Sequence, residues 1–424
     1  MKKKQWFRLD TAALIFPAIK RYNWNNVFRL SATLNESVDL EALERAVMDM
    51  SRRFPTFFVR LRTGFFWYYL ERLDQPAPIR RDYAYPLTHM STRELRRSCM
   101  RLLWHENRIA MELFHSVSDG GGASVFFKNL LVRYVYHKYG VEVAPEGEIV
   151  DIHASPQPEE LEDGFYRFAG PKAVGRGEED AYRLTGTRDE SGFNHLITGV
   201  VPTETLLEKA HEYKATATSF LAGVMAESIM KLEKRRLPGS ALQPVKITIA
   251  ANLRRIFPTR TMRNFVLAVN PGFDPAYGDY PLEDIIRIIT HQLAIELMPQ
   301  TMSGRIEENV APQRNPVIRV VPRVIKDVIM SMVYSSTGER KGSINISNLG
   351  QIALPEKVAG YVRRFEFIIG EQYSYPNNCS VASFGGNTYI NMIRNIHETD
   401  LERLFFSRLV ELGIPVDIET NERQ

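Results

Sequence analysis

The fold is decided by the stretch Met111-Glu-Leu-Phe-His-Ser-Val-Ser-Asp-Gly-Gly-Gly122. Before the histidine, residues 108–114 alternate apolar and polar side chains with the period of a β-strand. After it, residues 124–139 place most of their apolar side chains on one face of a helix. His115 is therefore expected at the end of a strand, on the turn into a helix, where α/β folds often carry reactive groups.

His115 is a candidate general base, because neutral imidazole accepts a proton near pH 7 when its other ring nitrogen is held as a donor. Asp119 is predicted to point away from the reacting atoms and to pair with an arginine, and it also suits the N-cap of the next helix. Gly120, Gly121 and Gly122 permit a tight turn and close approach by a substrate. Two other interpretations remain open. His115 could be purely structural, or the three glycines could bind a phosphate, although no Lys-Ser or Lys-Thr follows them as in a P-loop.

The pattern His-x-x-x-Asp-Gly resembles that of the chloramphenicol acetyltransferase-like acyltransferase superfamily. Other stretches agree with it in order: Ser51-Arg-Arg-Phe-Pro-Thr56, Ile249-Ala-Ala-Asn-Leu-Arg-Arg255 with Arg263-Asn-Phe265, and Ile344-Asn-Ile-Ser-Asn-Leu-Gly350. Phe114 stands where condensation domains usually carry a second histidine. The Asp-Phe-Gly-Trp-Gly segment of BAHD enzymes is absent from the sequence. The alcohol acetyltransferase-like branch therefore fits best.

The resemblance implies a two-lobed α/β fold, with a mixed sheet and flanking helices in each lobe and a tunnel between the lobes. It implies acyl transfer from acyl-CoA to a small or medium alcohol, with His115 as the base and no covalent enzyme intermediate. Acyl-CoA is then a co-substrate, and no cofactor or metal is expected. Two alternatives stay open: a condensation-type domain that takes its acyl group from an acyl carrier protein, and a non-catalytic member that binds a ligand or partner.

The resemblance also assigns roles to individual residues. Those assigned to catalysis are His115, Asp119 and Gly120. The donors predicted to stabilise the oxyanion are the backbone N–H of Gly120 or Gly121 and, across the lobe interface, Ser347 or Asn348. Ser347 and Asn348 also suit an ordinary turn at a strand end. Arg254 is the expected partner of Asp119, with Arg255 and Arg263 as rivals.

The chain length predicts two domains, because 424 residues exceed what one ordinary core accommodates. We expect an N-terminal lobe over residues 1–175 and a C-terminal lobe over 176–424. The first lobe ends in an irregular connector from about residue 141, because prolines and glycines interrupt the pattern up to about residue 194. This connector either lines a channel or is an ordinary surface loop.

The composition indicates which classes of binding partner and which cell compartment to expect. The net charge of +4 is mild, and no nucleic-acid-binding signature accompanies it; a basic edge that steers CoA phosphates is a weaker interpretation. No apolar run spans a bilayer. The basic start at residues 1–4 precedes Trp6-Phe-Arg-Leu-Asp10, which interrupts a signal peptide. Cys99 and Cys379 are too few for a disulfide framework. We therefore expect a cytoplasmic protein.

Periodicity predicts most of the remaining elements. Helices are expected over residues 40–52, 203–213, 218–234, 282–296 and 317–333. Strands are expected over residues 57–62, 66–70, 195–201 (an edge strand), 245–250, 343–348, 363–369, 379–384 and 389–394. A last helix is expected to begin at the capping box Thr399-Asp-Leu-Glu402.

Overall fold

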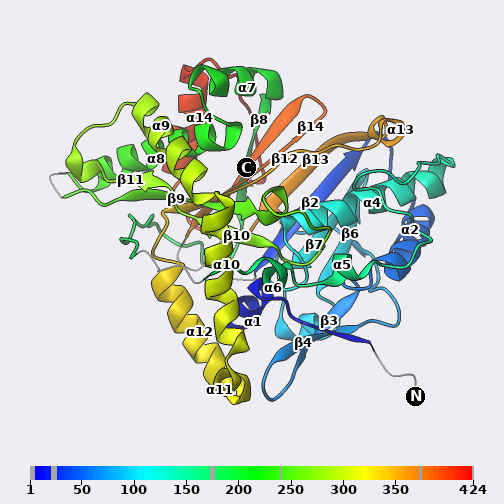
Figure 1. Ribbon diagram of the computed structural model, residues 1–424. Helices are drawn as coiled ribbons and strands as arrows, with labels where there is room; N and C mark the ends of the chain where they lie inside the picture. The colour runs from blue at the N-terminus through cyan, green and yellow to red at the C-terminus, as the bar shows by residue number, and fades with distance from the viewer. Residues whose placement is uncertain are drawn as a thin grey trace.

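Two large mixed β-sheets organise the chain, and helices pack against each of them (Figure 1). The computed structural model describes residues 5–20, 26–171, 177–238, 241–370, 372 and 375–422. Residues 1–4, whose basic character entered the prediction of the compartment, lie outside this range. The predicted fold class, a mixed sheet with flanking helices in each of two lobes, is confirmed.

The first lobe is built on a five-stranded sheet and a smaller three-stranded sheet, counted over the described residues. The larger sheet has the order β13 (Val362–Ile369), β2 (Val27–Leu34), β7 (Arg108–Phe114), β6 (Met100–His105) and β5 (Arg80–Arg81). The smaller sheet has the order β1 (Trp6–Arg8), β4 (Tyr68–Arg72) and β3 (Val59–Thr63). The helices of this half are α1 (Ile15–Ile19), α2 (Leu40–Arg53), α3 (Thr92–Leu95), α4 (Gly120–Tyr139), α5 (Pro158–Leu161) and α6 (Gly164–Phe168), with the 3-10 turn η1 (Ala12–Leu14).

The second lobe is built on an eight-stranded sheet, again counted over the described residues. Its order is β10 (Val266–Val269), β9 (Val245–Asn252), β12 (Ile344–Gln351), β14 (Asn377–Phe384), β15 (Asn387–Arg394), β8 (His195–Pro202) and β16 (Asp417–Thr420), with β11 (Gly272–Phe273) paired to β9. The helices in this half of the sequence are α7 (Thr203–Glu212), α8 (Ala217–Arg236), α9 (Leu282–Glu296), α10 (Pro299–Arg314), α11 (Pro316–Val320), α12 (Arg323–Thr337), α13 (Glu356–Ala359) and α14 (Asp400–Glu411), with the 3-10 turns η2 (Leu253–Arg255) and η3 (Pro275–Tyr277). Of these, α13 packs on the first lobe, since its Val358 is buried in the first-lobe core.

One strand of the first lobe comes from the far end of the sequence. β13 pairs antiparallel with β2 along its whole length, so the five-stranded sheet includes residues from the range 176–424 that was expected to form only the second lobe. Conversely, Phe165 of α6 is buried in the core of the second lobe. The irregular connector therefore contains a helix, α6. No single point in the sequence separates the residues of one lobe from those of the other.

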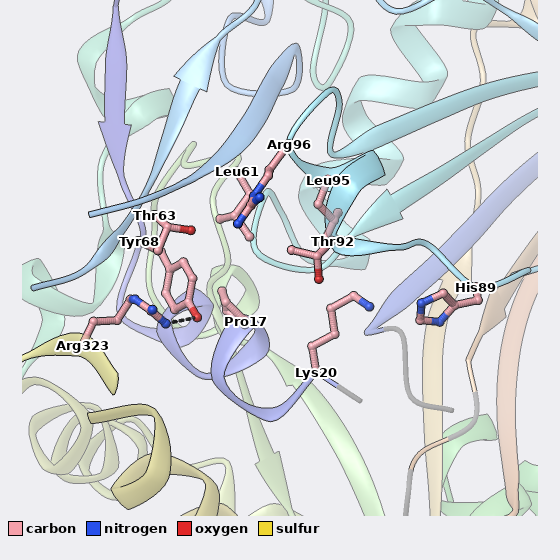
Figure 2. A pocket seen from close by; sticks show the side chains of 10 residues that line it. All are labelled: Pro17, Lys20, Leu61, Thr63, Tyr68, His89, Thr92, Leu95, Arg96 and Arg323. Atoms are coloured by element: carbon pink, nitrogen blue, oxygen red, sulfur yellow. Dashed lines mark hydrogen bonds between the residues drawn. The ribbon is translucent and has the colours of Figure 1, made fainter. Parts of the chain in front are cut away.

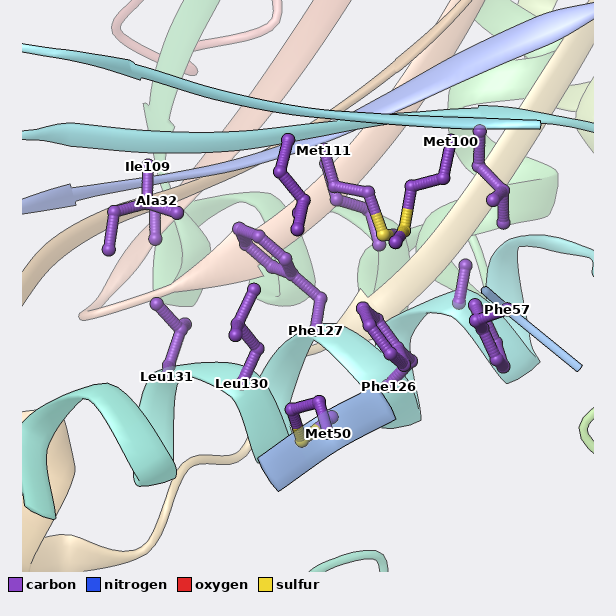
Figure 3. Packing of buried hydrophobic residues seen from close by; sticks show 14 of the residues in the cluster. Ala32, Met50, Phe57, Met100, Ile109, Met111, Phe126, Phe127, Leu130 and Leu131 are labelled. Atoms are coloured by element: carbon purple, nitrogen blue, oxygen red, sulfur yellow. The ribbon is translucent and has the colours of Figure 1, made fainter. Parts of the chain in front are cut away.

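The core of the first lobe forms where α2 and α4 cover the five-stranded sheet. Figure 3 shows side chains of α4 pointing toward the strands that carry Ile109 and Met111, with Met50 of α2 beside them. Phe126 of α4 is fully buried and stacks on Phe57 with ring centroids 4.3 Å apart. This packing fixes α4, and with it the turn before α4 that carries the His-x-x-x-Asp-Gly motif.

Several expected elements differ in the structure. β8 lies between β15 and β16 and is not an edge strand. The helix expected over 317–333 is two helices, because Pro322 disfavours helical backbone at the preceding residue and Val321 is extended. α10 was not anticipated. The capping box at Thr399 does not form; Glu402 is buried and accepts a hydrogen bond from Asn377 instead. None of the helices in the described part of the chain is long and apolar enough to cross a bilayer.

Replacing Phe126 by alanine should test how far the α4 packing stabilises the lobe. We expect Phe126→Ala to lower the free energy of unfolding by about 3–5 kcal/mol, because it opens a cavity in a close-packed core. Urea denaturation followed by circular dichroism measures this. Tyr83→Ala is the control, since its side chain is 85% exposed and its replacement should change stability by less than about 0.5 kcal/mol.

Candidate active site

His115 lies immediately after β7, on the turn into α4. Its backbone N–H donates to the carbonyl of Asn26 at 2.9 Å, which continues the sheet pairing by one residue. The imidazole stacks on Phe16, with ring centroids 4.3 Å apart, and meets the edge of Phe28 at 5.2 Å. Two aromatic rings therefore hold the histidine ring in one orientation.

Asn264 sets the tautomer of His115. The Nδ1 of His115 lies 2.9 Å from the Oδ1 of Asn264. The Nδ2 of Asn264 in turn donates to the Oδ2 of Asp10 at 3.1 Å. Because the Asp10 carboxylate takes the donor side of the amide, the amide oxygen faces the imidazole. Nδ1 of His115 is thereby assigned as the donor, and Nε2 is left as an acceptor, as a general base requires.

Burial has the largest effect on the pKa values of His115 and Asp10, the two ionisable groups that Asn264 connects. It lowers the pKa of His115 below its ordinary value, against the opposing effects of the Asp119 charge and the Asn264 hydrogen bond. Burial also raises the pKa of Asp10 to about 6, against the Arg263 guanidinium. At neutral pH the imidazole is therefore uncharged, while Asp10 still has the ionised form that accepts from Asn264.

Asp119 joins the two lobes and does not face the imidazole. Its Oδ1 caps α4 by accepting from the Gly122 N–H at 2.9 Å. The Nη1 of Arg254 donates to both carboxylate oxygens, at 3.0 and 2.9 Å. The Phe265 N–H donates to Oδ2 at 2.6 Å. Asp119 is thus both the helix cap and the partner of Arg254, and the two roles proposed for it coexist.

A Cβ at any of the three glycines would meet protein groups. A Cβ on Gly122 would lie 2.4 Å from the Met262 carbonyl oxygen, and a Cβ on Gly121 would lie 3.1 Å from the Arg254 guanidinium. At Gly120 it would lie 3.0 Å from Leu349. The glycines are therefore needed because the second lobe packs directly on the start of α4.

The other residues expected at the site separate into two groups. Ser347 lines the same cavity as His115. Asn348 lies within β12, where the register with β14 shifts between Asn348 and Gln351, and not in a turn at the strand end. Its Nδ2 donates to Thr218 at 3.0 Å and its Oδ1 accepts from the Gly350 N–H at 2.7 Å. Of the arginines that rivalled Arg254, Arg263 pairs with Asp10 at 3.3 Å.

The cavity at His115 has a volume of about 150 Å³ and takes its walls from both lobes. The first half of the chain contributes Phe16, Asn26, Val27, Phe28, Leu87 and His115. The second half contributes Ala250, Tyr334, Asn345, Ser347, Ile369, Gly370 and Gln372. The candidate base therefore lies at the lobe interface, a common place for ligand sites.

A larger cavity, of about 410 Å³, lies next to it around α1 (Figure 2). Pro17 lines this cavity, and the preceding residue, Phe16, lines the smaller one. Cationic side chains in its wall come from Lys20, Arg96 and Arg323, and no carboxylate is among its lining residues. His115 lines the smaller cavity and is not among the described residues that line the larger one.

Within the described residues, a single group of side chains could hold a metal ion. Asp189, His195 and His397 bring their ligand atoms within 4.8 Å of one another. None of them lines either cavity. His195 already bonds Asp189 at 3.0 Å through Nε2 and Glu422 at 2.9 Å through Nδ1, so hydrogen bonding accounts for this group.

Comparisons with known proteins bear on the fold of the chain. No family model matches the sequence, and no curated protein sequence matches it. Solved structures do match. Polyketide synthase associated protein 5 from Mycobacterium tuberculosis superposes with a TM-score of 0.58 at 15% identity, covering 95% of this chain and 96% of that one. TRI101 of F. sporotrichioides, solved with coenzyme A and T-2, has a TM-score of 0.66 at 12% identity, covering 94% and 97%.

The chain has the chloramphenicol acetyltransferase-like fold. This fold also includes the epimerization domain from the third module of tyrocidine synthetase B, which matches with a TM-score of 0.60 at 13% identity and covers 97% of this chain and 96% of its own. Acyl transfer and epimerization are different reactions, so membership in the chloramphenicol acetyltransferase-like fold does not fix the activity.

Two site residues were missed in the sequence. Asn264 lies in the stretch Arg263-Asn-Phe265, which resembled a turn of the family, but nothing in the sequence indicated that its side chain contacts His115. Asp10 gave no signal, because its contact with Asn264 joins segments that are remote in sequence.

Arg254→Met should test the pairing between lobes. Asp119 is only 4% exposed, so removal of Arg254 leaves a buried carboxylate without its countercharge. We expect a loss of about 3–5 kcal/mol in the free energy of unfolding, measured by urea denaturation. The matched control is Arg287→Met, which removes a surface pair with Asp284 and should cost less than about 1 kcal/mol. Equal effects of both variants would contradict the assignment.

Proposed function

We propose that the protein transfers an acyl group from acyl-CoA to the hydroxyl of an alcohol, with His115 as the general base. The observation that carries the proposal is the fixed tautomer of His115 in a cavity walled by both lobes. Nδ1 is held by Asn264, so Nε2 is the nitrogen available to a reacting proton. The CoA complex of TRI101, whose fold covers nearly the whole chain, supports acyl-CoA as the donor class.

The reaction needs no covalent intermediate on the protein. Nε2 of His115 takes the proton of the acceptor hydroxyl as its oxygen attacks the thioester carbonyl. The tetrahedral oxyanion then collapses, the C–S bond breaks, and the proton on Nε2 goes to the leaving thiolate. We assign the Ser347 side chain to the oxyanion, because Ser347 lines the cavity, whereas the Asn348 amide already donates to Thr218. The Gly120 N–H at the start of α4 is the backbone candidate.

A carrier-protein donor is the second candidate. The structural neighbours include the condensation domain of Monacolin K polyketide synthase MokA, with a TM-score of 0.57 at 12% identity over 96% of each chain. Phe114 stands in place of the second histidine of such domains, which favours acyl-CoA. Thiol release from free acyl-CoA distinguishes the two donors directly.

The first test is release of CoA from acetyl-, butyryl- and longer acyl-CoAs in the presence of alcohols and amines. We expect acceptor-dependent release that falls by about 10²-fold or more in His115→Ala, because the general base is lost. His211→Ala, at an exposed helix position, is the control and should retain full activity. Undiminished activity in His115→Ala would refute this mechanism.

The pH dependence of kcat/KM provides an independent check, because it reports ionisations of the free enzyme. The base acts as neutral imidazole, and burial lowers its pKa below the ordinary value of 6.5. The activity should therefore be complete at neutral pH and be lost only as the pH falls through that lowered pKa. A steady-state profile of kcat/KM between about pH 4.5 and 8, taken at substrate concentrations well below KM, measures the acid limb of the free enzyme. A midpoint above 6.5 would contradict burial as the controlling effect.

Asn264→Ala should identify Asn264 as a positioning residue. We expect kcat to fall about 10–10²-fold with little change in KM, because the imidazole loses the partner that fixes its tautomer. The Asn264 hydrogen bond also raises the pKa of His115, so the acid limb should move to lower pH in the variant. A loss of activity without that shift would indicate a merely structural role. Asn309→Ala, an exposed amide, is the control.

A further inference from the structure

α12 presents its apolar face to solvent. Val324, Ile325, Val328, Ile329, Met332 and Val333 recur with helical spacing, and each side chain is at least half exposed. We call these six residues the α12 stripe. A helix on the surface of a globular protein normally turns such a stripe toward the core. An exposed apolar surface of this extent indicates a binding surface.

The polar side of α12 faces the protein instead. The Nη1 of Arg323 donates to the hydroxyl of Tyr68 at 2.7 Å, and Asp327 accepts from the same hydroxyl at 3.0 Å. The Nζ of Lys326 donates to the carbonyl of Phe66 at 3.1 Å. These contacts fix the rotation of the helix about its axis, so the outward direction of the α12 stripe is built into the fold.

Aromatic side chains extend the same surface. The Arg323 N–H donates to the carbonyl of Phe65 at 2.9 Å, which places the tip of the β3–β4 hairpin beside the start of α12. Phe65 is 73% exposed and Trp67 is 46% exposed. Val317 and Val320 of α11 are also exposed, and Figure 1 shows α11 and the β3–β4 hairpin at the same end of the molecule.

The charges around the α12 stripe are mainly positive. Residues 309–338 include the basic side chains Arg314, Arg319, Arg323 and Lys326 and one acid, Asp327. Arg314 is paired with Glu307 and Arg323 with Asp327, which leaves Arg319 and Lys326 as the cations of this segment that form no ion pair within the described residues. The 410 Å³ cavity behind the hairpin adds Lys20 and Arg96 (Figure 2). Aliphatic and aromatic side chains bordered by cations are complementary to a bilayer surface that carries anionic lipids.

We propose that the α12 stripe, with Phe65 and Trp67, docks on an anionic lipid bilayer. α12 has 15 residues, which is about 22 Å of helix, shorter than the roughly 30 Å hydrocarbon core; it therefore lies in the interface. Tyr334, one residue beyond the stripe, lines the cavity that contains His115. Docking would thus bring the candidate active site next to the lipid. The proposal concerns surface binding and does not depend on acyl transfer.

A second copy of the chain is a poorer occupant. A twofold interface brings the same patch of both subunits together, so the basic side chains bordering the stripe would face their own copies. A bilayer with anionic headgroups meets the same cations with opposite charge.

Co-sedimentation with vesicles tests the proposal in the absence of substrates. We expect the full chain to bind vesicles of equimolar phosphatidylcholine and phosphatidylglycerol, and to bind pure phosphatidylcholine at least about tenfold more weakly. The triple variant Val324→Ser, Val328→Ser, Met332→Ser should lose at least about tenfold in partitioning to the mixed vesicles. Val410→Ser is the control: this valine is exposed on α14 to a similar degree, 55%, and its replacement should change nothing.

Light scattering of the same proteins without vesicles tests self-association, which is the alternative to lipid binding. If the wild type is a dimer that does not bind vesicles and the triple variant is a monomer, the proposal is overturned in favour of a self-association surface. Equal binding by the wild type and the triple variant would overturn it as well. Retained thiol release in the triple variant with soluble substrates would show that the fold and active site are intact, so failure of docking and failure of the catalytic proposal remain distinguishable.

Discussion

The buried carboxylate of Asp119 is the interaction on which the rest of the site depends. It caps α4 through Gly122, pairs with Arg254 and accepts from the backbone of Phe265. One carboxylate thus fixes the turn that carries His115 and the segment of the second lobe that carries Asn264. The two residues meet at 2.9 Å because both backbones are tied to the same side chain. The hydrogen bonds of Asp119 therefore fix the position of His115 in one lobe relative to Asn264 in the other.

The local part of this arrangement could be predicted from sequence. Alternation before His115 and the Asp-Gly turn after it gave a strand, a loop and a helix, and the structure has β7 and α4 at those places. Asp119 needed a partner because a buried carboxylate is costly alone, and the resemblance predicted Arg254 as that partner, with Arg255 and Arg263 as rivals. The contact between Asp10 and Asn264 could not be predicted, because it depends on tertiary packing of segments remote in sequence and neither residue has a periodic or motif signal.

α12 illustrates another limit of periodicity. The spacing of its valines, isoleucines and methionine identifies an amphipathic helix, yet it does not say toward which medium the apolar face points. That direction is set by hydrogen bonds from Arg323 and Lys326 to the β3–β4 hairpin. Pro322 likewise divides the expected helix and gives α12 an orientation of its own. Sequence patterns therefore describe faces of an element, while tertiary contacts decide their use.

The pairing of β13 with β2 has a consequence for synthesis of the chain. β13 is synthesised long after β2, because residues 35–361 lie between the two strands. Until β13 arrives, β2 has an unpaired edge in an otherwise completed first-lobe sheet, and such edges invite pairing with other chains. Contacts between segments so distant in sequence also form slowly. The nascent first lobe is thus vulnerable to aggregation during that interval, and chaperone protection of that edge would matter most before β13 is made.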